Sequence, residues 1–296
     1  MSYRIGLGLA VALLTTPTSQ LLGQCGNAIR WSNIHERIHI RHNLNTSKEV
    51  AQPAFFQIVR PFGGDPVASV NAGVRVDACA TPLLTTGLFS EYLWNTATDK
   101  RQNTVRAGVD AEWQVREISS AAHTNSPLLL IQANYKNDNE KKNESAQAVV
   151  TYTHVFRNEP WPAPNATWRP SEVLDITYAP FIGVVAEQVF RAQDPTREGT
   201  ILRGVFQLDA NLYPLGVRLD RRVELNGSYA YRYDITDGTS EADDHHPYFR
   251  GALNVFFFRD ENKSAGASLA YIDGEDPTRG FEDQRLWQLG FTLRIK

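Results

Sequence analysis

The sequence lacks long hydrophobic runs. None of its 296 residues belongs to an uninterrupted apolar stretch of the roughly 18 residues that a membrane-spanning helix needs. Beyond the N-terminus, purely apolar pieces such as residues 128–131 are far too short to cross a bilayer as helix. A helical inner-membrane protein is therefore excluded.

Positive charge is also in short supply, and so is helical periodicity. Thirty Lys and Arg face 33 Asp and Glu, which gives a net charge of −3. This balance excludes a nucleic-acid-binding protein and a basic membrane-surface protein. No helical period extends over more than two turns, so we expect an all-β chain.

Cysteine occurs only twice, at Cys25 and Cys79. The N-terminus has the charge, length and polar exit of a secretory signal: Arg4, an apolar stretch over residues 5–14, then a polar stretch over 15–19. Both cysteines would then enter an oxidising compartment, where a disulfide between them is the expected state. Lipidation of Cys25 is the alternative, although Gln24 argues against it because Gly, Ala or Ser normally precedes a lipidated cysteine.

These features divide the chain into three parts. We expect a signal peptide over residues 1–24, cleaved between Ser19 and Ala28, and an N-terminal periplasmic or luminal segment over 25–50. The remainder, residues 51–296, is expected to form one large domain.

Strict alternation of apolar and polar residues is the strongest pattern in that domain. From Val105 to Val115 one face carries Val105, Ala107, Val109, Ala111, Trp113 and Val115, and the other carries Arg106, Gly108, Asp110, Glu112 and Gln114, with Arg116 continuing it. Residues 222–234 repeat the pattern. Because successive side chains of a strand point to opposite sides, both segments predict strands between an apolar and a charged environment.

The same pattern recurs along the chain and predicts about twelve strands separated by polar turns. They lie near residues 54–62, 66–78, 83–95, 104–117, 127–137, 145–157, 172–191, 200–213, 222–234, 248–259, 265–273 and 284–296. Residues 158–170, rich in Trp and Pro, break the rhythm. With an even strand number this segment falls at the end that holds both termini, where a long connection is unexpected.

Three features favour lipid on the apolar faces over the core of a soluble sandwich. Fourteen residues such as 104–117 span on the order of 35 Å at a tilt near 40°, enough for an apolar band of about 25 Å. Tyr229, Tyr231, Tyr233 and Trp287 suit an interfacial aromatic girdle. The polar faces carry opposite charges in mid-strand. We therefore predict an antiparallel up-and-down transmembrane β-barrel, with the soluble sandwich as the alternative.

The last strand carries a family resemblance. Arg285, Trp287, Leu289, Phe291, Leu293 and Ile295 alternate with Leu286, Gln288, Gly290, Thr292, Arg294 and Lys296. This strand resembles the terminal strand of bacterial outer-membrane β-barrel proteins, whose ending helps the outer-membrane assembly machinery recognise them. The resemblance implies a location in the bacterial outer membrane, with its lipid and that machinery as partners. Ile295 and Lys296 depart from the usual terminal aromatic residue.

A barrel of this size lies between filled eight-stranded barrels and open 16-stranded porins. We expect a pore or channel for passage or export of small hydrophilic solutes, without a cofactor. The alternative is a structural or adhesive surface barrel that does not conduct. The candidate pore-lining residues are Arg106, Asp110, Glu112, Arg116, Arg203, Asp209, Glu224 and Arg232.

Two patterns in the sequence resemble metal-binding motifs. His35, Glu36 and His39 match the HExxH zinc signature, but that signature needs a helix, and residues 38–42 alternate like a strand. Residues 243–246 (DDHH) offer cation ligands, but adjacent residues on a loop make a poor preformed cage. A polar N-terminal arm and a solvated loop explain these patterns better.

Two further alternatives concern enzymatic or carbohydrate-binding function. A membrane-embedded lipid hydrolase would need a serine activated by His154, and no serine shares its face of the predicted strand. We interpret His154 as a girdle residue. A secreted β protein binding a carbohydrate through Trp161 and Trp168 is the remaining alternative.

Overall fold

The computed structural model describes ten stretches of the chain, residues 37–41, 54–59, 67–96, 101–118, 124–157, 161–216, 218–238, 244–260, 263–276 and 282–295. Their strands are β1 (Ile38–Arg41), β2 (Ala54–Val59), β3 (Val67–Ala80), β4 (Leu84–Asn95), β5 (Gln102–Gln114), β6 (Asn125–Asp138), β7 (Asn143–Phe156), β8 (Thr167–Ser171), β9 (Leu174–Arg191), β10 (Gly199–Pro214), β11 (Val223–Asp237), β12 (His245–Arg259), β13 (Lys263–Asp276) and β14 (Glu282–Ile295). None of the helices described is long and apolar enough to cross a bilayer.

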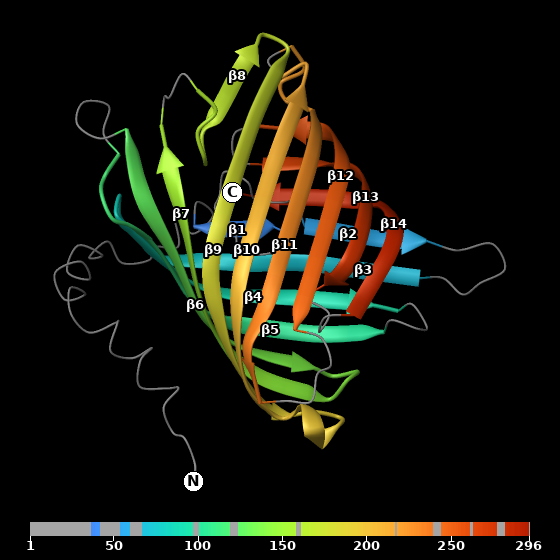
Figure 1. Ribbon diagram of the computed structural model, residues 1–296. Coiled ribbons are helices and arrows are strands. Elements are labelled where there is room, and N and C mark those ends of the chain that lie inside the picture. Colours follow the sequence, from blue (N-terminus) through green and yellow to red (C-terminus); the bar gives the residue numbers. More distant parts are fainter. Residues whose placement is uncertain are drawn as a thin grey trace.

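The strands form one closed antiparallel barrel. Each pairs with its sequence neighbour, β7 passes directly to β9, and β14 closes the ring on β1 and β2. Of the fourteen strands, β8 lies off this path, and β1 and β2 share one position in the wall, which leaves twelve positions. In Figure 1 the steep front strands β9–β11 cross β3–β5 behind them at a large angle, as opposite walls of a tilted barrel do. The predicted twelve-stranded barrel is confirmed.

The first wall position is built from two short strands. On β3, Arg41 of β1 pairs with Gly73 and Phe55 of β2 pairs with Asn71. Residues 38–41, which the sequence assigned to a segment ahead of the barrel, are therefore part of the wall. The alternation of residues 38–42 is visible in the sequence, but so short a segment, separated from the next predicted strand, does not by itself indicate a place in the barrel wall.

The two ends of the barrel differ. We call the end where β1 begins and β14 finishes the N/C end, and the opposite end the far end. At the N/C end, β8 forms a hairpin with β9, since Trp168 pairs with Ile176, and it stands above the wall at the top of Figure 1. The described part of the segment 158–170, residues 161–170, thus lies at the predicted end, and its residues 167–170 belong to this strand.

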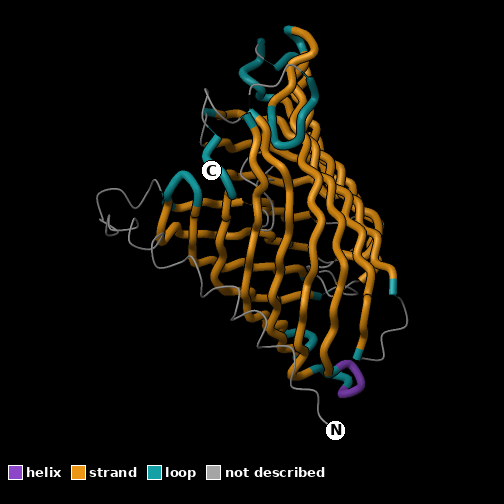
Figure 2. Tube along the Cα trace, turned by 60° about the vertical axis from the view of Figure 1, so that its left-hand side comes forward, coloured by secondary structure: helices purple, strands orange, loops and turns teal. Residues whose placement is uncertain are grey.

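Among the described residues, a single 3-10 turn, Pro195–Arg197, lies at the far end between β9 and β10 (Figure 2, purple). Asp194 is its N-cap: the backbone N–H of Thr196 donates to Asp194 Oδ1 at 3.0 Å, and the hydroxyl of Thr196 donates to the same oxygen. These hydrogen bonds hold the pKa of the Asp194 carboxyl below its usual range.

The outer face is apolar and exposed. Leu88 is 60% exposed, Ile182 61% and Phe257 63%, and each alternates with a covered neighbour. A globular protein in water buries such side chains, so exposed apolar residues around a whole barrel indicate contact with lipid.

Aromatic residues bound this apolar belt. Along β5, Asn103 lies opposite Trp94 and Trp113 opposite Leu84, so ten residues separate the two levels and cover roughly 25 Å of membrane depth. At the far end the ring centres of Tyr271 and Trp287 lie 5.0 Å apart. Beside them is an outward ion pair between Arg285 and Asp273. Charge on the outer face thus begins where the aromatic girdle ends. An apolar belt of this height around a polar interior makes the chain an outer-membrane β-barrel.

Candidate functional site

The inner face carries the candidate pore-lining residues. Five of the eight are buried, two are half-buried, and Arg116, just beyond the end of β5, is exposed at the N/C end. The buried five are Arg106, Asp110, Arg203, Asp209 and Glu224, and the half-buried two are Glu112 and Arg232. Because their strand neighbours are more exposed and lie on the belt, the covered side chains point into the barrel.

Arg75 of β3 is the centre of one charged network. Its Nη1 lies 2.6 Å from Asp77 Oδ1 and 3.5 Å from Glu112 Oε1, and its Nε lies 2.8 Å from Asp110 Oδ1. His39 of β1 adds a 2.8 Å contact between Nε2 and Asp77 Oδ2. A fully buried guanidinium is therefore surrounded by three carboxylates, so the surplus charge of this network is negative.

A glycine makes the Arg75 network geometrically feasible. Arg75 and Asp110 lie on β3 and β5, with β4 between them, and Gly87 of β4 pairs with both Asp77 and Asp110. A Cβ at Gly87 would stand 2.9 Å from Arg75 Nε and 3.1 Å from Asp110 Oδ1. The absent side chain is what lets the guanidinium pass over β4.

Glu224 of β11 is the centre of a second network with the opposite arrangement. Its Oε2 lies 3.3 Å from Nη2 of Arg294 and 3.3 Å from Nη1 of Arg259. Asn254 donates to the other oxygen at 2.9 Å. Both guanidinium groups also stack against Phe256, at 5.5 and 4.9 Å from the ring centre. One buried carboxylate between two arginines leaves a positive surplus on β11–β14, a part of the wall that β1 and β2 separate from β3–β5 in the strand order.

A third network lies toward the far end. Arg203 of β10 contacts Glu187 Oε2 through Nη1 and Asp234 Oδ1 through Nε, both at 2.7 Å. The ring of His246 contacts Asp234 through Nε2 at 3.5 Å and a carboxylate oxygen of Glu275 through Nδ1. These contacts join β9, β10, β11, β12 and β13 in one chain of charges.

Alternation in the sequence indicates which charges share a face, but it does not give their partners. Arg106 pairs with Glu91 at 2.6 Å, and Asp209 accepts a hydrogen bond from Gln207 at 2.7 Å. Same-face residues within a strand lie about 6.6 Å apart, whereas directly opposite residues on neighbouring strands lie about 5 Å apart. Charges therefore pair mostly across strands, and a single strand's pattern does not contain that register.

Several network residues were not among the pore-lining candidates from the sequence. They are His39, Arg75, Asp77, Glu91, Glu187, Asp234, Arg259, Glu275 and Arg294. The signal that finds most of them is present, because they are charged or imidazole residues at inward positions of alternating strands. Arg259 and Glu275 are the exceptions, since Arg259 follows a β-bulge at Phe256/Phe258 and Glu275 follows Gly274, whose φ is 97°.

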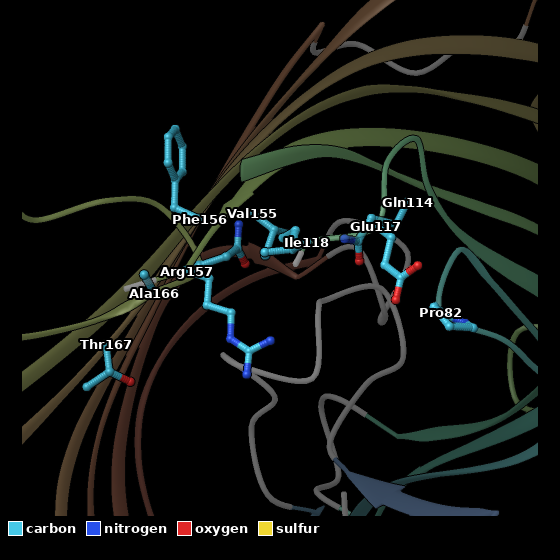
Figure 3. A pocket seen from close by; sticks show the side chains of 10 residues that line it. Pro82, Gln114, Glu117, Ile118, Val155, Phe156, Arg157, Ala166 and Thr167 are labelled. Carbon is cyan, nitrogen blue, oxygen red and sulfur yellow. The ribbon is translucent and has the colours of Figure 1, made fainter. Parts of the chain in front are cut away.

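A cavity of about 540 Å³ opens at the N/C end. Its lining comes from Pro82, Gln114, Glu117, Ile118, Val155, Phe156, Arg157, Asn165, Ala166 and Thr167. In Figure 3 the guanidinium of Arg157 and the carboxylate of Glu117 project from separate elements to the same side, while the ring of Phe156 points away. This volume is typical of small-molecule sites.

The cavity is bounded by a strap, which we define as residues 163–168. β7 pairs with β9 only as far as Tyr152 opposite Ile182, and the strap lies where the two strands diverge. The backbone N–H of Asn165 donates to Tyr178 O of β9 at 2.7 Å, and its Nδ2 donates to His154 O of β7 at 2.9 Å. Its φ of 55° is a left-handed conformation that asparagine tolerates well. The strap therefore bridges strands that no longer reach each other.

His154 lies on the outer face next to this strap. Its Nδ1 contacts Tyr152 OH at 3.0 Å, its Nε2 contacts Asn125 Oδ1 at 3.1 Å, and its ring lies 4.8 Å from Phe156. Trp161 packs on Phe156 at 5.3 Å. Both imidazole nitrogens are engaged by tyrosine and asparagine rather than serine, as in a girdle.

The cysteine and histidine patterns of the sequence lie in different parts of the molecule. Cys79 is disulfide-bonded, and Cys25 lies outside the described residues. His35 and Glu36 also lie outside them, while His39 belongs to strand β1. His245 faces out and stacks on Tyr233 at 5.1 Å, whereas His246 faces in, so the DDHH run is split between two faces. Among the described residues no cluster of three metal-ligating side chains occurs.

Comparison with known proteins shows a likeness of fold to a solved structure. No family model and no curated protein matches the chain. Among solved structures, it is similar to the transport unit of the autotransporter AIDA-I from Escherichia coli, with 12% identity over 94% of this chain and 96% of that chain and a TM-score of 0.44. At this level of similarity nothing about function transfers to this chain.

Proposed function

We propose that this outer-membrane barrel is a narrow pore for small hydrophilic solutes. The observation that carries the proposal is a row of polar side chains that leads inward from the N/C mouth. Exposed charges at the N/C mouth, Arg116, Glu117 and Arg157, are followed inward by half-buried Glu112 and then by the buried Arg75 network. A hydrated solute entering this end would meet polar groups at each level.

The ion pairs support a wall-lining role. Arg106 and Glu91 are on neighbouring strands, Arg75 and Asp110 are two positions apart, and Glu224 and Arg294 are three apart. Side chains on opposite walls of this barrel are six positions apart. These pairs therefore hold long side chains along the wall.

The size of the bore limits the solute. Twelve strands about 4.8 Å apart and tilted by about 40° enclose a cylinder of roughly 24 Å between backbones, which inward side chains narrow. Several of those side chains are almost fully covered: Arg75 and Glu224 are 0% exposed and Arg294 is 2% exposed. A pore this closely packed is selective for small solutes.

The same burial favours a second candidate, a structural or adhesive barrel that does not conduct. A filled interior stabilises the wall and leaves only the loops for contact with a partner, as in small filled barrels.

Planar bilayers separate the two functions. Purified barrel should give discrete conductance steps, and Glu112→Gln should change the ratio of cation to anion permeability, measured as the reversal potential in a salt gradient. Glu112 suits this test because its side chain is accessible at the inner wall. Absence of steps with correctly folded protein, verified by heat-modifiable gel mobility, would favour the non-conducting barrel.

A further inference from the structure

We infer that the cavity at the N/C mouth is a binding site for zwitterionic solutes, in which Arg157 receives a carboxylate and Glu117 receives an ammonium group. Solutes of this chemistry include amino acids and short peptides. The inference deepens the proposed function and rests on it for its biological role. Binding itself does not require conduction.

The two cavity charges differ from the charges deeper in the barrel. Arg75, Glu224 and Arg203 each have oppositely charged partners within 3.5 Å. By contrast, the part of the chain that the structure describes provides no ion-pair or hydrogen-bond partner for the guanidinium of Arg157 or the carboxylate of Glu117. Both are exposed. Among the described residues they are exposed charges available to a ligand, in contrast to the paired charges of Arg75, Glu224 and Arg203.

The framework around the two charges is held in place. Arg157 follows β7, and its backbone N–H donates to Thr124 O at 2.8 Å. The N–H of Phe156 donates to Pro164 O at 3.3 Å, which fixes the strap beside it. On the other side, Gln114 Nε2 donates to Arg116 O at 2.8 Å, just before Glu117. A ligand would therefore meet charges on positioned backbone elements, which lowers the entropic cost of binding.

The lining matches a small zwitterion in its other properties. Ile118 and Val155 provide apolar surface between the polar ends (Figure 3), as a peptide backbone with small side chains requires. One positive and one negative group make the two lining charges neutral in sum, which disfavours ions of a single sign. Guanidinium to carboxylate and carboxylate to ammonium are both charge-assisted contacts.

Four dipeptides of matched backbone test the assignment in isothermal titration calorimetry on the full chain in detergent. They are Ala-Ala, N-acetyl-Ala-Ala, Ala-Ala-amide and N-acetyl-Ala-Ala-amide. Ala-Ala should bind about three- to tenfold more tightly than either singly capped form, and the doubly capped form should bind weakest.

Two variants identify which side chain binds which end of the dipeptide. Arg157→Gln should abolish the preference for a free carboxylate while retaining the preference for a free amine, and Glu117→Gln should do the reverse. Arg285→Gln is the matched control, because Arg285 is an exposed outer-face arginine at the far end. Heat-modifiable mobility confirms that each variant is folded.

The outcomes separate this inference from the pore. Equal binding of all four dipeptides, or an unchanged preference in both variants, overturns the zwitterion site whether or not the barrel conducts. Retained preference in a barrel that gives no conductance steps overturns the pore and keeps the site. Tighter binding of N-acetyl-Ala-Ala than of Ala-Ala would indicate a simple anion site and also contradict the inference.

Discussion

The two faces of β5 show opposite uses of neighbouring residues. Val109 is 51% exposed on the outer face, and Asp110, the next residue, is 8% exposed on the inner face. A soluble barrel would reverse these environments. The outer face is therefore stabilised by a lack of polar groups, whereas the inner face is stabilised by the pairing of charges. Each face is sensitive to a different substitution.

The largest loss of stability is expected on the inner face, at Arg75, which contacts three carboxylates. Arg75→Met leaves Asp77, Asp110 and Glu112 around an apolar side chain, so we expect a loss of about 3 to 5 kcal/mol in the free energy of unfolding. Urea titration of folding into large vesicles measures it. Arg116→Met, the same change at an exposed position of the mouth, should have little effect, and equal losses for both would contradict the network.

The outer face should respond to introduced charge according to depth. Val109→Arg is expected to cost about 2 to 4 kcal/mol near the bilayer midplane, and Val115→Arg about 0 to 1 kcal/mol near the interface. Both valines are exposed on the outer face, at the middle and the N/C end of the same alternating segment. The vesicle titration applies again. A Val109→Arg barrel as stable as wild type would place this face in water.

A smaller effect is expected where an inner charge is redundant. Glu112 lies 3.5 Å from Arg75, which Asp77 and Asp110 already neutralise at 2.6 and 2.8 Å. Glu112→Gln should therefore cost less than about 1 kcal/mol in unfolding. Asp110→Asn, which removes a closer partner, should cost more. The reverse order would show that the long contact dominates.

The smallest effect should come from charges outside the belt. The ion pair of Arg285 and Asp273 is exposed, so solvent and salt screen it. Arg285→Gln should leave the urea midpoint unchanged at both low and high salt. A clear loss of stability would mean that this pair is within the membrane and that the belt extends further toward the far end.

Much of the fold was predictable because it depends on a local pattern. Alternation from Val105 to Val115 fixes which side chains share a face, and repetition of that pattern gives twelve wall positions. The pairing of Arg75 with Asp110 was not predictable, since it depends on Gly87 and on the register of three strands. The strap around Asn165 was also missed, because its hydrogen bonds join segments that carry no shared sequence pattern.

The two-part first strand gives the barrel a site where a foreign peptide can be inserted. On β14, Ile40 pairs with Ile295 and Ala54 pairs with Leu293, so Arg41 and Ala54 occupy consecutive positions of the wall although twelve residues separate them in the chain. Joining Arg41 directly to Ala54 would keep every side chain on its face. The point between them is accordingly where an engineer would graft a peptide or a tag, since the wall is already built to continue past an interruption there.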